Sequence, residues 1–344
     1  MLRSLWLRLR SWEGLLLLLL LVVLFFNVTR VPNFLTVGNQ INLFQLGIEK
    51  AIVILAMAFV IISGEIDLSV ASMMGLSAAI TAAGFEAGWP LPVAILVALS
   101  VGAGFGLVNG YFVAVVGLSS LAVTLAGYIG FRGLARLLVQ DRSVGGFPDW
   151  FTNLGQRGFL GPITLSILIY ALLAVVATII LHFSGLGRLT YVIGNSAPVA
   201  RYSGVSVVRT RMIIFMMSGL VAALAGVLMT ARLGAVRAST AEGFELDIIT
   251  VVLLGGVSIF GGVGSMVGVL LATYLVLNLR NGLVIAGVTG NTQTGIIGLL
   301  LILSVLAPNL VERARERLRR RQADAAVRPP PGATGESARA VSTG

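Results

Sequence analysis

Residues 15–26 read LLLLLLLVVLFF, an unbroken run of apolar side chains near the start of the chain. Arg3, Arg8 and Arg10 precede the run, as they would in a secretory signal peptide. No small-residue cleavage site follows it, since the next residues are Asn-Val-Thr-Arg-Val-Pro. The run is therefore predicted to be a retained first membrane-spanning helix.

The same apolar character extends over most of the 344 residues. Hydrophobic residues make up 57% of the chain and charged residues only 11%. A soluble protein of this size cannot hide that much apolar surface from water, whereas lipid solvates it. The 42 glycines agree with this class, because glycine lets membrane helices approach closely. The sequence predicts an all-α polytopic membrane protein.

Ten apolar segments are candidate membrane-spanning or partly re-entrant helices. They cover roughly residues 14–30, 46–63, 68–84, 92–116, 119–138, 161–183, 211–231, 246–260, 264–280 and 293–308. The third, eighth and ninth are shorter than the about 20 residues that cross a bilayer, and glycines interrupt them. Such segments are expected to be discontinuous helices that their neighbours shield from lipid.

The basic residues predict which way the chain crosses the membrane. An even number of spans puts both termini on one side, and 15 of the 24 lysines and arginines fall on that side. The positive-inside rule then places the N-terminal segment 1–13 and the C-terminus in the cytoplasm, around a transmembrane domain over 14–308. The arginine-rich stretch 309–321 is expected to form a short helix against anionic lipid headgroups, and 322–344 a disordered tail.

Composition also excludes several classes of site. The net charge of +10 comes from basic residues scattered between apolar runs, which does not resemble a nucleic-acid-binding stripe. The chain has no cysteine and one histidine, His182, so no thiolate or multi-histidine metal site and no cysteine nucleophile is expected. Arg132 and Arg136, near the end of the fifth span, are interpreted as side chains that snorkel toward the membrane surface.

Two carboxylates follow the second span, within the stretch Gly64-Glu65-Ile66-Asp67-Leu68-Ser69. A charged carboxylate at mid-bilayer depth costs about 2.5–3.5 kcal/mol, so it needs a partner, water or a protein-lined niche. One interpretation is a broken-helix element of a transport path. The other is an ordinary interfacial turn, with Asp67 or Ser69 as a helix N-cap. The spacing leaves the two equally open.

A second acidic pair, Glu245 and Asp247, precedes a glycine-rich stretch with the doublets Gly255-Gly256 and Gly261-Gly262. Glycines at this density permit close backbone crossings. The stretch lacks the lysine of a phosphate-binding loop, so nucleotide binding is rejected and any energy source lies in another chain. Glu245-Leu246-Asp247 also resembles Glu65-Ile66-Asp67 five spans earlier, which would suit an inverted repeat of two five-span halves. A chance match of three residues is the alternative.

The longest predicted cytoplasmic loop, 187–211, has the signals of a short helix. Asn195 or Ser196 suits its N-cap, Pro198 its first turn and Gly204 its end. Such a helix would lie outside the membrane and offer Arg201 and Tyr202 to a partner. A plain connecting helix is the alternative.

These stretches, taken in order from about residue 40 to 308, resemble the membrane permeases of ribose-type ABC importers. That family includes ribose, xylose, rhamnose and autoinducer-2 systems. Many members have glycine at the position of Glu65, and again at that of Ala71. This variant is most similar to the permeases of rhamnose or autoinducer-2 uptake.

The resemblance implies a permease subunit with a type II importer-like fold in a bacterial inner membrane. Its partners would be a second permease copy, identical or related, a cytoplasmic ATPase that uses ATP and Mg²⁺, and a periplasmic sugar-binding protein. No cofactor or metal would be bound by this chain. Sugar specificity would reside mainly in the binding protein.

The resemblance also assigns roles to residues. Coupling to the ATPase would involve Asn195, Ala197, Ala200, Arg201, Tyr202, Ser203 and Gly204. The translocation path would involve Gly64, Glu65, Asp67, Ser69, Glu245, Asp247, Gly255, Gly256, Gly261 and Gly262. Four arginines on the predicted outer side, Arg142, Arg157, Arg232 and Arg237, are candidates for docking the binding protein.

Two other classes remain as alternatives. An ion-coupled secondary transporter would use the intramembrane carboxylates Glu65, Asp67, Glu245 and Asp247. An integral-membrane transferase would need clustered acidic metal ligands or a cationic phosphate site, and the sequence shows neither.

Overall fold

The computed structural model describes residues 12–30, 34–140, 142–290, 292–293, 295–296, 298–299 and 302. The chain divides into two units, 1–301 and 302–344, and the fold below is that of the first. Residues 1–11, most of the tenth predicted span, the predicted helix 309–321 and the predicted tail 322–344 lie outside the described residues.

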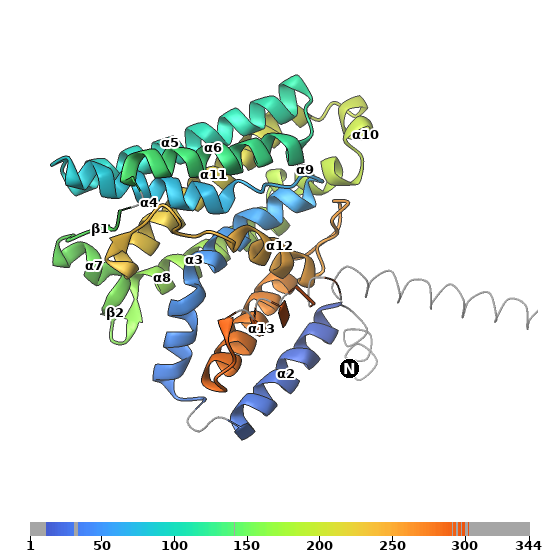
Figure 1. Cartoon of the computed structure of the whole chain (residues 1–344). Coiled ribbons are helices and arrows are strands. Elements are labelled where there is room, and N and C mark those ends of the chain that lie inside the picture. Colours follow the sequence, from blue (N-terminus) through green and yellow to red (C-terminus); the bar gives the residue numbers. More distant parts are fainter. Residues whose placement is uncertain are drawn as a thin grey trace, which may run out of the picture. The chain divides into compact units, whose positions relative to one another are not determined.

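Nearly all of the secondary structure is helical (Figure 1). The helices are α2 (Trp12–Arg30), α3 (Val37–Ile62), α4 (Val70–Glu86), α5 (Leu91–Tyr111) with the π-helical turn η1 (Phe112–Val116), α6 (Ser120–Val139), α7 (Asp149–Gln156), α8 (Leu165–Phe183), α9 (Gly185–Asn195), α10 (Ala197–Tyr202), α11 (Val207–Leu233), α12 (Phe244–Leu254) and α13 (Met266–Ile285).

Seven helices among the described residues are long and apolar enough to cross a membrane: α2, α3, α5 with η1, α6, α8, α11 and α13. This confirms the prediction of an all-α polytopic membrane protein. Two further helices are short, as predicted, with 17 residues in α4 and 11 in α12. The ninth span is not short, however, because α13 has 20 residues.

Four short strands connect loops at one end of the molecule. β1 (Val144–Gly145) pairs antiparallel with β4 (Ala235–Val236), and Val144 lies opposite Val236. β2 (Gly158–Leu160) pairs antiparallel with β3 (Ile163–Thr164). We call this the strand end. The opposite end, where α9 and α10 lie, is called the α10 end (Figure 1).

Helix α3 is the central element of the bundle. In its most apolar window 83% of the residues are buried, against 22% for α2 and for α8. A helix that is apolar on all sides is stable only when neighbours surround it. Helices α8, α11, α12 and α13 all pack on α3. Side chains on α3 are therefore placed to contact several other helices at once.

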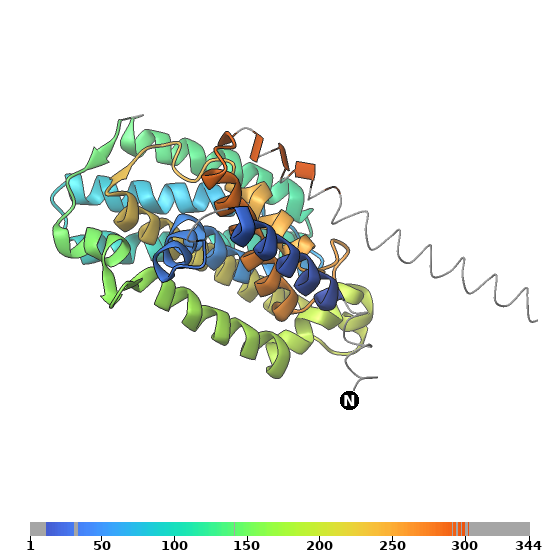
Figure 2. The same ribbon diagram turned by 90° about the horizontal axis from the view of Figure 1, so that it is seen from below.

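The helix pairs partly follow the predicted inverted repeat. Helices α4 and α5 both pack on α11, and their counterparts five spans later, α12 and α13, both pack on α3 (Figures 1 and 2). The outer helices differ, since α2 packs on α13 while its counterpart α8 packs on α3. The two acidic pairs also differ in place. Asp67 precedes α4, whereas Asp247 lies in the first turn of α12.

The eighth span ends earlier than the sequence predicts. Helix α12 stops at Leu254, because Gly256 adopts a φ of +85° and the chain turns away. A Cβ at Gly255 would lie 2.7 Å from the Cα of Val269, so α12 and α13 cross closely there. The indole Nε1 of Trp12 donates to the carbonyl of Leu254 at 2.8 Å and attaches the start of α2 to this turn.

The predicted loop 187–211 is mostly helical. Helix α9 continues to Asn195, α10 follows after a single residue, and α11 begins at Val207. The predicted short helix is therefore confirmed, whereas the predicted start of the next span at residue 211 is four residues too late. Ser184 caps α9 by accepting from the backbone N–H of Gly187 at 3.2 Å.

Candidate functional site: a glycine junction, a short outer helix and buried ion pairs

Three segments far apart in the sequence meet at the α10 end. They are the end of α3, the end of α9 and the loop between α12 and α13. The backbone N–H of Gly262 donates to the carbonyl of Ile62 at 2.8 Å. A Cβ at Gly64 would stand 3.7 Å from the Cα of Gly194. We call Gly64, Gly194, Gly261 and Gly262 the glycine junction.

The junction requires glycine for two separate reasons. Gly64, Gly261 and Gly262 all have positive φ, at +81°, +81° and +73°, which side chains rarely tolerate. A Cβ at Gly261 would also lie 2.7 Å from the Cα of Gly64, and one at Gly262 would lie 2.9 Å from the Cα of Asn195. Three of the predicted site residues, Gly64, Gly261 and Gly262, are thus brought together.

Helix α10 lies beside this junction and is capped at both ends. Ser196 caps it by accepting from the N–H of Val199 at 3.4 Å. At its other end Gly204 has a φ of +80°, and the N–H of Val205 donates to the carbonyl of Ala200 at 3.0 Å. This pairing closes a helix C-terminus with glycine in the left-handed conformation.

The two faces of α10 differ in exposure. Ala200 is fully buried and clusters with Ile193 of α9 and Val207 of α11. Tyr202 is 93% exposed, and Arg201 and Ser203 are exposed beside it. A large aromatic side chain at such exposure suits contact with another protein.

A second tie joins α9 to the loop before α13. The hydroxyl of Tyr191 donates to the carbonyl of Gly264 at 2.8 Å. Burial raises the pKa of Tyr191 above its usual value, so the neutral donor form is favoured. His182, at the end of α8, accepts from the N–H of Met266 at 3.2 Å and meets the first residue of α13.

The first acidic pair is buried just after the end of α3. Glu65 forms an ion pair with Arg211 of α11 at 2.7 Å. Asp67 is 2% exposed, accepts from the N–H and hydroxyl of Ser69 at 2.9 and 2.6 Å, and accepts from Ser218 of α11 at 2.9 Å. The pair therefore joins α4 to α11 and is not a solvated interfacial turn. Ser69 occupies the N-cap position of α4 but makes no side-chain cap.

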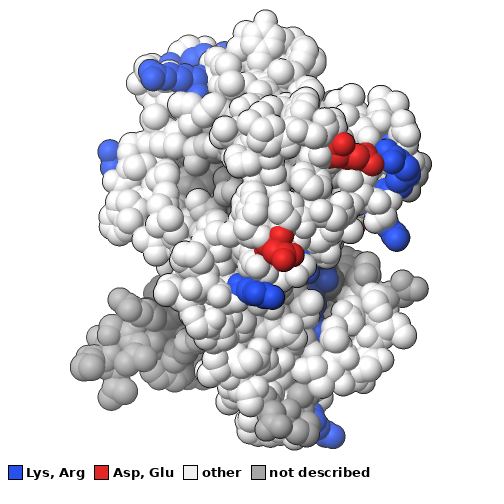
Figure 3. All heavy atoms as spheres, turned by 90° about the vertical axis from the view of Figure 1, so that its left-hand side faces the viewer, with Lys and Arg blue, Asp and Glu red and all other residues white. Residues whose placement is uncertain are grey.

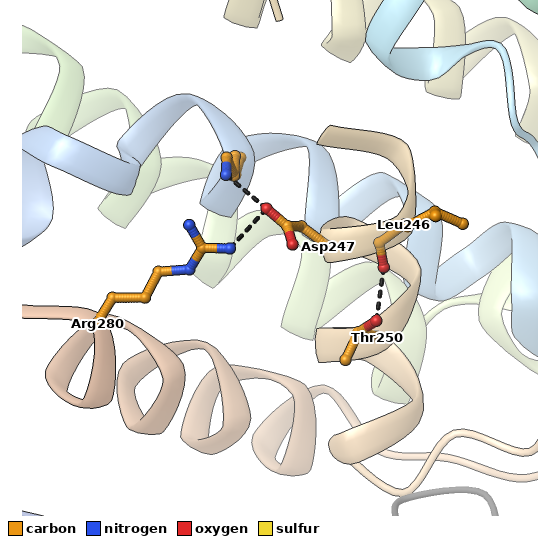
Figure 4. A network of polar contacts seen from close by, with 5 residues as sticks. Leu246, Asp247, Thr250 and Arg280 are labelled. Carbon is orange, nitrogen blue, oxygen red and sulfur yellow. Dashed lines mark hydrogen bonds and ion pairs between the residues drawn. The ribbon is translucent and has the colours of Figure 1, made fainter. Parts of the chain in front are cut away.

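The second acidic pair separates into two environments. Asp247 receives two cations on the same oxygen, Lys50 of α3 and Arg280 of α13, each at 2.6 Å from Oδ2 (Figure 4). Lys50 also lies 3.9 Å from the ring centroid of Phe244, which adds a cation–π contact. Glu245 is buried, and its Oε2 has no hydrogen-bond partner among the described residues.

A second ion pair lies next to Lys50 in the sequence and joins α3 to α11. Glu49 is 1% exposed and receives the guanidinium of Arg232 at 2.6 Å on Oε1 and 3.2 Å on Oε2. Arg232, one of the four arginines interpreted as docking residues for a binding protein, is thus partly buried in an ion pair at the end of α11. Removing it would leave a buried carboxylate without a counter-charge.

Arg132 does not snorkel. It is 7% exposed, and its Nη1 donates to the carbonyls of Ala238 and Thr240 at 2.8 Å each. These carbonyls lie in the loop between β4 and α12, in which Ala241 has a φ of +62°. Arg132 therefore fixes a strained loop that sets the start of α12. A Cβ on Gly75 of α4 would lie 2.9 Å from the same Nη1.

The other three candidate docking arginines lie at the strand end. Arg142, Arg157 and Arg237 are exposed, and Arg142 is paired with the exposed Glu86 at 3.0 Å. Figure 3 looks onto this side and shows a few basic and acidic groups on an otherwise uncharged surface. The structure thus brings these three arginines to one end.

The sequence analysis missed Glu49, Lys50 and Arg280. A signal existed for the first two, because they are adjacent charges inside the predicted span 46–63. Charges inside a membrane span need partners and mark functional or structural sites. Among the described residues, no three side chains of His, Cys, Asp or Glu form a group that could hold a metal ion.

Comparison with known proteins places the whole bundle in context. Residues 40–305 match the protein family described as branched-chain amino acid transport system / permease component. The autoinducer 2 import system permease protein LsrD of Salmonella paratyphi A is 35% identical over 303 residues, which is 86% of this chain and 91% of that protein. The protein of the same name from Yersinia pseudotuberculosis serotype O:3 is 35% identical over 265 residues, 75% of this chain and 79% of that protein. No solved structure matches.

Proposed function

Because the chain belongs to this family of transport-system permease components, we propose that it is the membrane-spanning subunit of an ATP-driven importer for autoinducer-2 or a similar sugar-like molecule. Family membership and the seven apolar helices make it a multi-pass inner-membrane protein. The rest of the proposal concerns what it binds, what drives it and which of its ends meets which partner.

The observation that carries the proposal is the link between α10 and the central helix α3. Helix α10 follows α9 directly, α9 ends in the glycine junction, and Gly262 bonds to the last residue of α3. A displacement of α10 by a partner bound at the exposed Tyr202 face would be transmitted to α3 through backbone contacts rather than through flexible side chains. Helix α10 is therefore proposed to dock on a cytoplasmic ATPase and to transmit its closure.

The two ends of the bundle are proposed to bind different partners. The arginine distribution supports a cytoplasmic location for the α10 end, where the ATPase would hydrolyse ATP with Mg²⁺. The strand end would then face the periplasm, where Arg142, Arg157 and Arg237 would pair with acidic residues of a ligand-binding protein. A second permease copy, identical or related, would complete the membrane core.

The substrate proposal rests on the relatives. The family description names branched-chain amino acids, whereas both relatives reported above are named for autoinducer 2 and align over most of this chain. Similarity over that length outweighs a description that covers the whole family. The buried polar groups around Asp247 also suit a hydroxyl-rich molecule better than an aliphatic side chain.

An ion-coupled secondary transporter is not favoured. Such a protein needs carboxylates that are free to take up and release an ion. Glu65 and Asp247 are both held in ion pairs, and Asp67 accepts three hydrogen bonds. Glu245 is not held in this way, because its Oε2 has no hydrogen-bond partner among the described residues, so one of the four candidate carboxylates remains. An integral-membrane transferase is not favoured either, because the family is one of transport proteins.

The proposal is tested by uptake in cells. Bacteria that lack their own importer would express this chain together with a candidate ATPase and a candidate binding protein from the same organism. We expect autoinducer-2 to disappear from the medium, and leucine uptake to stay at background. An ATPase variant that cannot hydrolyse ATP should abolish the effect. Leucine uptake without autoinducer-2 uptake, or uptake that persists with the inactive ATPase, would overturn the proposal.

A further inference from the structure

A cavity of about 220 Å³ lies between α3, α12 and α13. Most of its wall is apolar, with side chains such as Ile54, Val251 and Val276. One part of the wall is polar and carries Lys50, Asp247 and Arg280. Pockets for drug-sized ligands hold about 300–1,000 Å³, so this cavity suits a smaller molecule.

The three charged groups leave hydrogen-bonding capacity facing the cavity. Lys50 and Arg280 both contact Oδ2 of Asp247, and Oδ1 has no hydrogen-bond partner among the described residues (Figure 4). An ammonium has three N–H donors and a guanidinium has five, of which each uses one on Asp247. Donors and an acceptor are thus presented side by side.

The position of Lys50 and Asp247 along their helices suggests a place on the transport path. Lys50 is the fourteenth of the 26 residues of α3, so at a rise of about 1.5 Å per residue it lies close to the middle of the helix. Asp247 belongs to the first turn of the short helix α12, which is the place where a discontinuous helix begins inside a transporter. Two cations that share one carboxylate at this depth need further solvation by water or a ligand.

We propose that this cavity is a binding station for a small polyhydroxylated, sugar-like molecule on its way through the membrane. The inference rests on the proposed import function and adds residues to it. Asp247 accepts from hydroxyl groups of the passing molecule, Lys50 and Arg280 donate to its oxygens, and the apolar wall packs against its carbon skeleton. Two cations beside one carboxylate favour neutral or anionic molecules and oppose cations.

A lipid headgroup would also present oxygens to these donors. The test below separates the two, because an aqueous probe enters a hydrated cavity and does not enter one that lipid fills. Competition by a water-soluble sugar-like molecule would not occur in the second case.

The chain has no cysteine, so a single introduced cysteine reports on one place alone. Thr273 lines the cavity, and its hydroxyl bonds only to the carbonyl of Val269 in its own helix, so Thr273→Cys should be tolerated. Leu172→Cys on α8 is the control, since this side chain is 64% exposed on an apolar helix and lines no part of the cavity.

The full chain is studied together with its ATPase in membrane vesicles. A negatively charged methanethiosulfonate reagent should modify Thr273→Cys and leave Leu172→Cys unmodified. Autoinducer-2, ribose and rhamnose are then added as probes, with leucine for comparison. We expect at least one of the three hydroxyl-rich probes to slow the modification of Thr273→Cys, and leucine not to.

Charge variants identify the groups that hold the molecule. In the Thr273→Cys background, Arg280→Gln should raise the probe concentration for half-protection by about tenfold, the effect of one lost charge-assisted hydrogen bond. Arg280→Lys keeps the charge and should raise it less. Arg136→Gln removes an exposed guanidinium of α6 that does not line the cavity, and it should leave the concentration unchanged.

The outcomes separate this inference from the proposed function. Suppose that the wild-type importer takes up its substrate. If the reagent then fails to modify Thr273→Cys, or modifies it with no protection by any hydroxyl-rich probe, the proposed binding role of the cavity is contradicted and the proposed import function is not. Equal effects of Arg280→Gln and Arg136→Gln on protection would also overturn it. Protection without ATP-dependent uptake would support the cavity and contradict the importer.

Discussion

The backbone N–H of Gly262 donates to the carbonyl of Ile62 at 2.8 Å, which joins the loop before α13 to the last residue of the central helix. The end of α9 lies in the same junction, and α10 follows it after one residue. Main-chain contacts therefore connect the exposed helix α10 to α3. The first two predictions concern this connection.

Gly261→Ala should damage the junction. The added Cβ would lie 2.7 Å from the Cα of Gly64, in a residue with a φ of +81°. The backbone strain costs about 1–3 kcal/mol, so the unfolding temperature in detergent should fall. Gly130→Ala in α6 has open space around it and should be neutral or stabilise by up to about 1 kcal/mol. Equal stability of the two variants would count against a tight junction.

Arg201→Glu combined with Gly204→Leu should uncouple ATP hydrolysis from uptake while the protein still inserts in the membrane. The second change forces leucine into a φ of +80°, at a cost of about 1–2 kcal/mol confined to the end of α10. Tyr202→Ala is the companion variant, since that side chain is 93% exposed and its loss should change stability by less than about 0.5 kcal/mol. Hydrolysis and uptake are measured together. Wild-type coupling in both variants would remove α10 from the mechanism.

Arg132→Met should loosen the loop before α12. It would leave the carbonyls of Ala238 and Thr240 without their donor, at about 1–3 kcal/mol for each buried group. Thermal unfolding measures the loss. Arg136→Met, one turn later and exposed, is the matched control and should change stability by less than about 0.5 kcal/mol. If the two variants unfold alike, Arg132 does not hold the loop.

Tyr191→Phe removes the hydrogen bond to Gly264, so it should lower the free energy of unfolding by about 1 kcal/mol between neutral pH and pH 9. Burial raises the pKa of Tyr191 above its usual value of 10, so above pH 10 the unfolded chain loses this proton before the folded chain does. Wild-type stability should then fall with rising pH, and the phenylalanine variant should lack that contribution. A difference between the two proteins that grows above pH 10 would contradict this sign.

Replacing Arg142, Arg157 and Arg237 together by serine should weaken docking of the binding protein without unfolding the permease, since all three are exposed. Arg232→Ser should destabilise the permease and leave docking of the binding protein unchanged. It leaves the buried Glu49 unpaired, which typically costs about 3–5 kcal/mol of stability. Binding-protein affinity and unfolding temperature, measured on both variants, separate the two roles. Unchanged docking in the triple variant would exclude these arginines.

Local chemistry predicted several features well. The short helix α10 was predicted from Ser196, Pro198 and Gly204, because helix caps and glycine ends depend on a few neighbouring residues. Most of the spans followed from apolar run length alone, which the bilayer thickness fixes. The place where α12 ends was missed, since it depends on how closely Gly255 approaches α13.

Partnerships over long sequence separations were not predictable. Arg132 was interpreted as a snorkelling side chain because its own helix gives no sign of the loop that follows β4, which begins 98 residues after the end of α6. The partners of Lys50, Asp247 and Phe244, likewise lie in α12, about 200 residues away in the chain. Only the packed bundle brings such groups together, and the sequence shows merely that a charged residue in a span needs some partner.

Uptake into vesicles tests the central claim most directly. Vesicles would contain this chain and its ATPase, hold ATP on the side of the ATPase, and receive autoinducer-2 with the binding protein outside. The account predicts uptake that requires ATP and the binding protein and that persists when the proton gradient is collapsed. Uptake that needs the proton gradient and continues without ATP would contradict it.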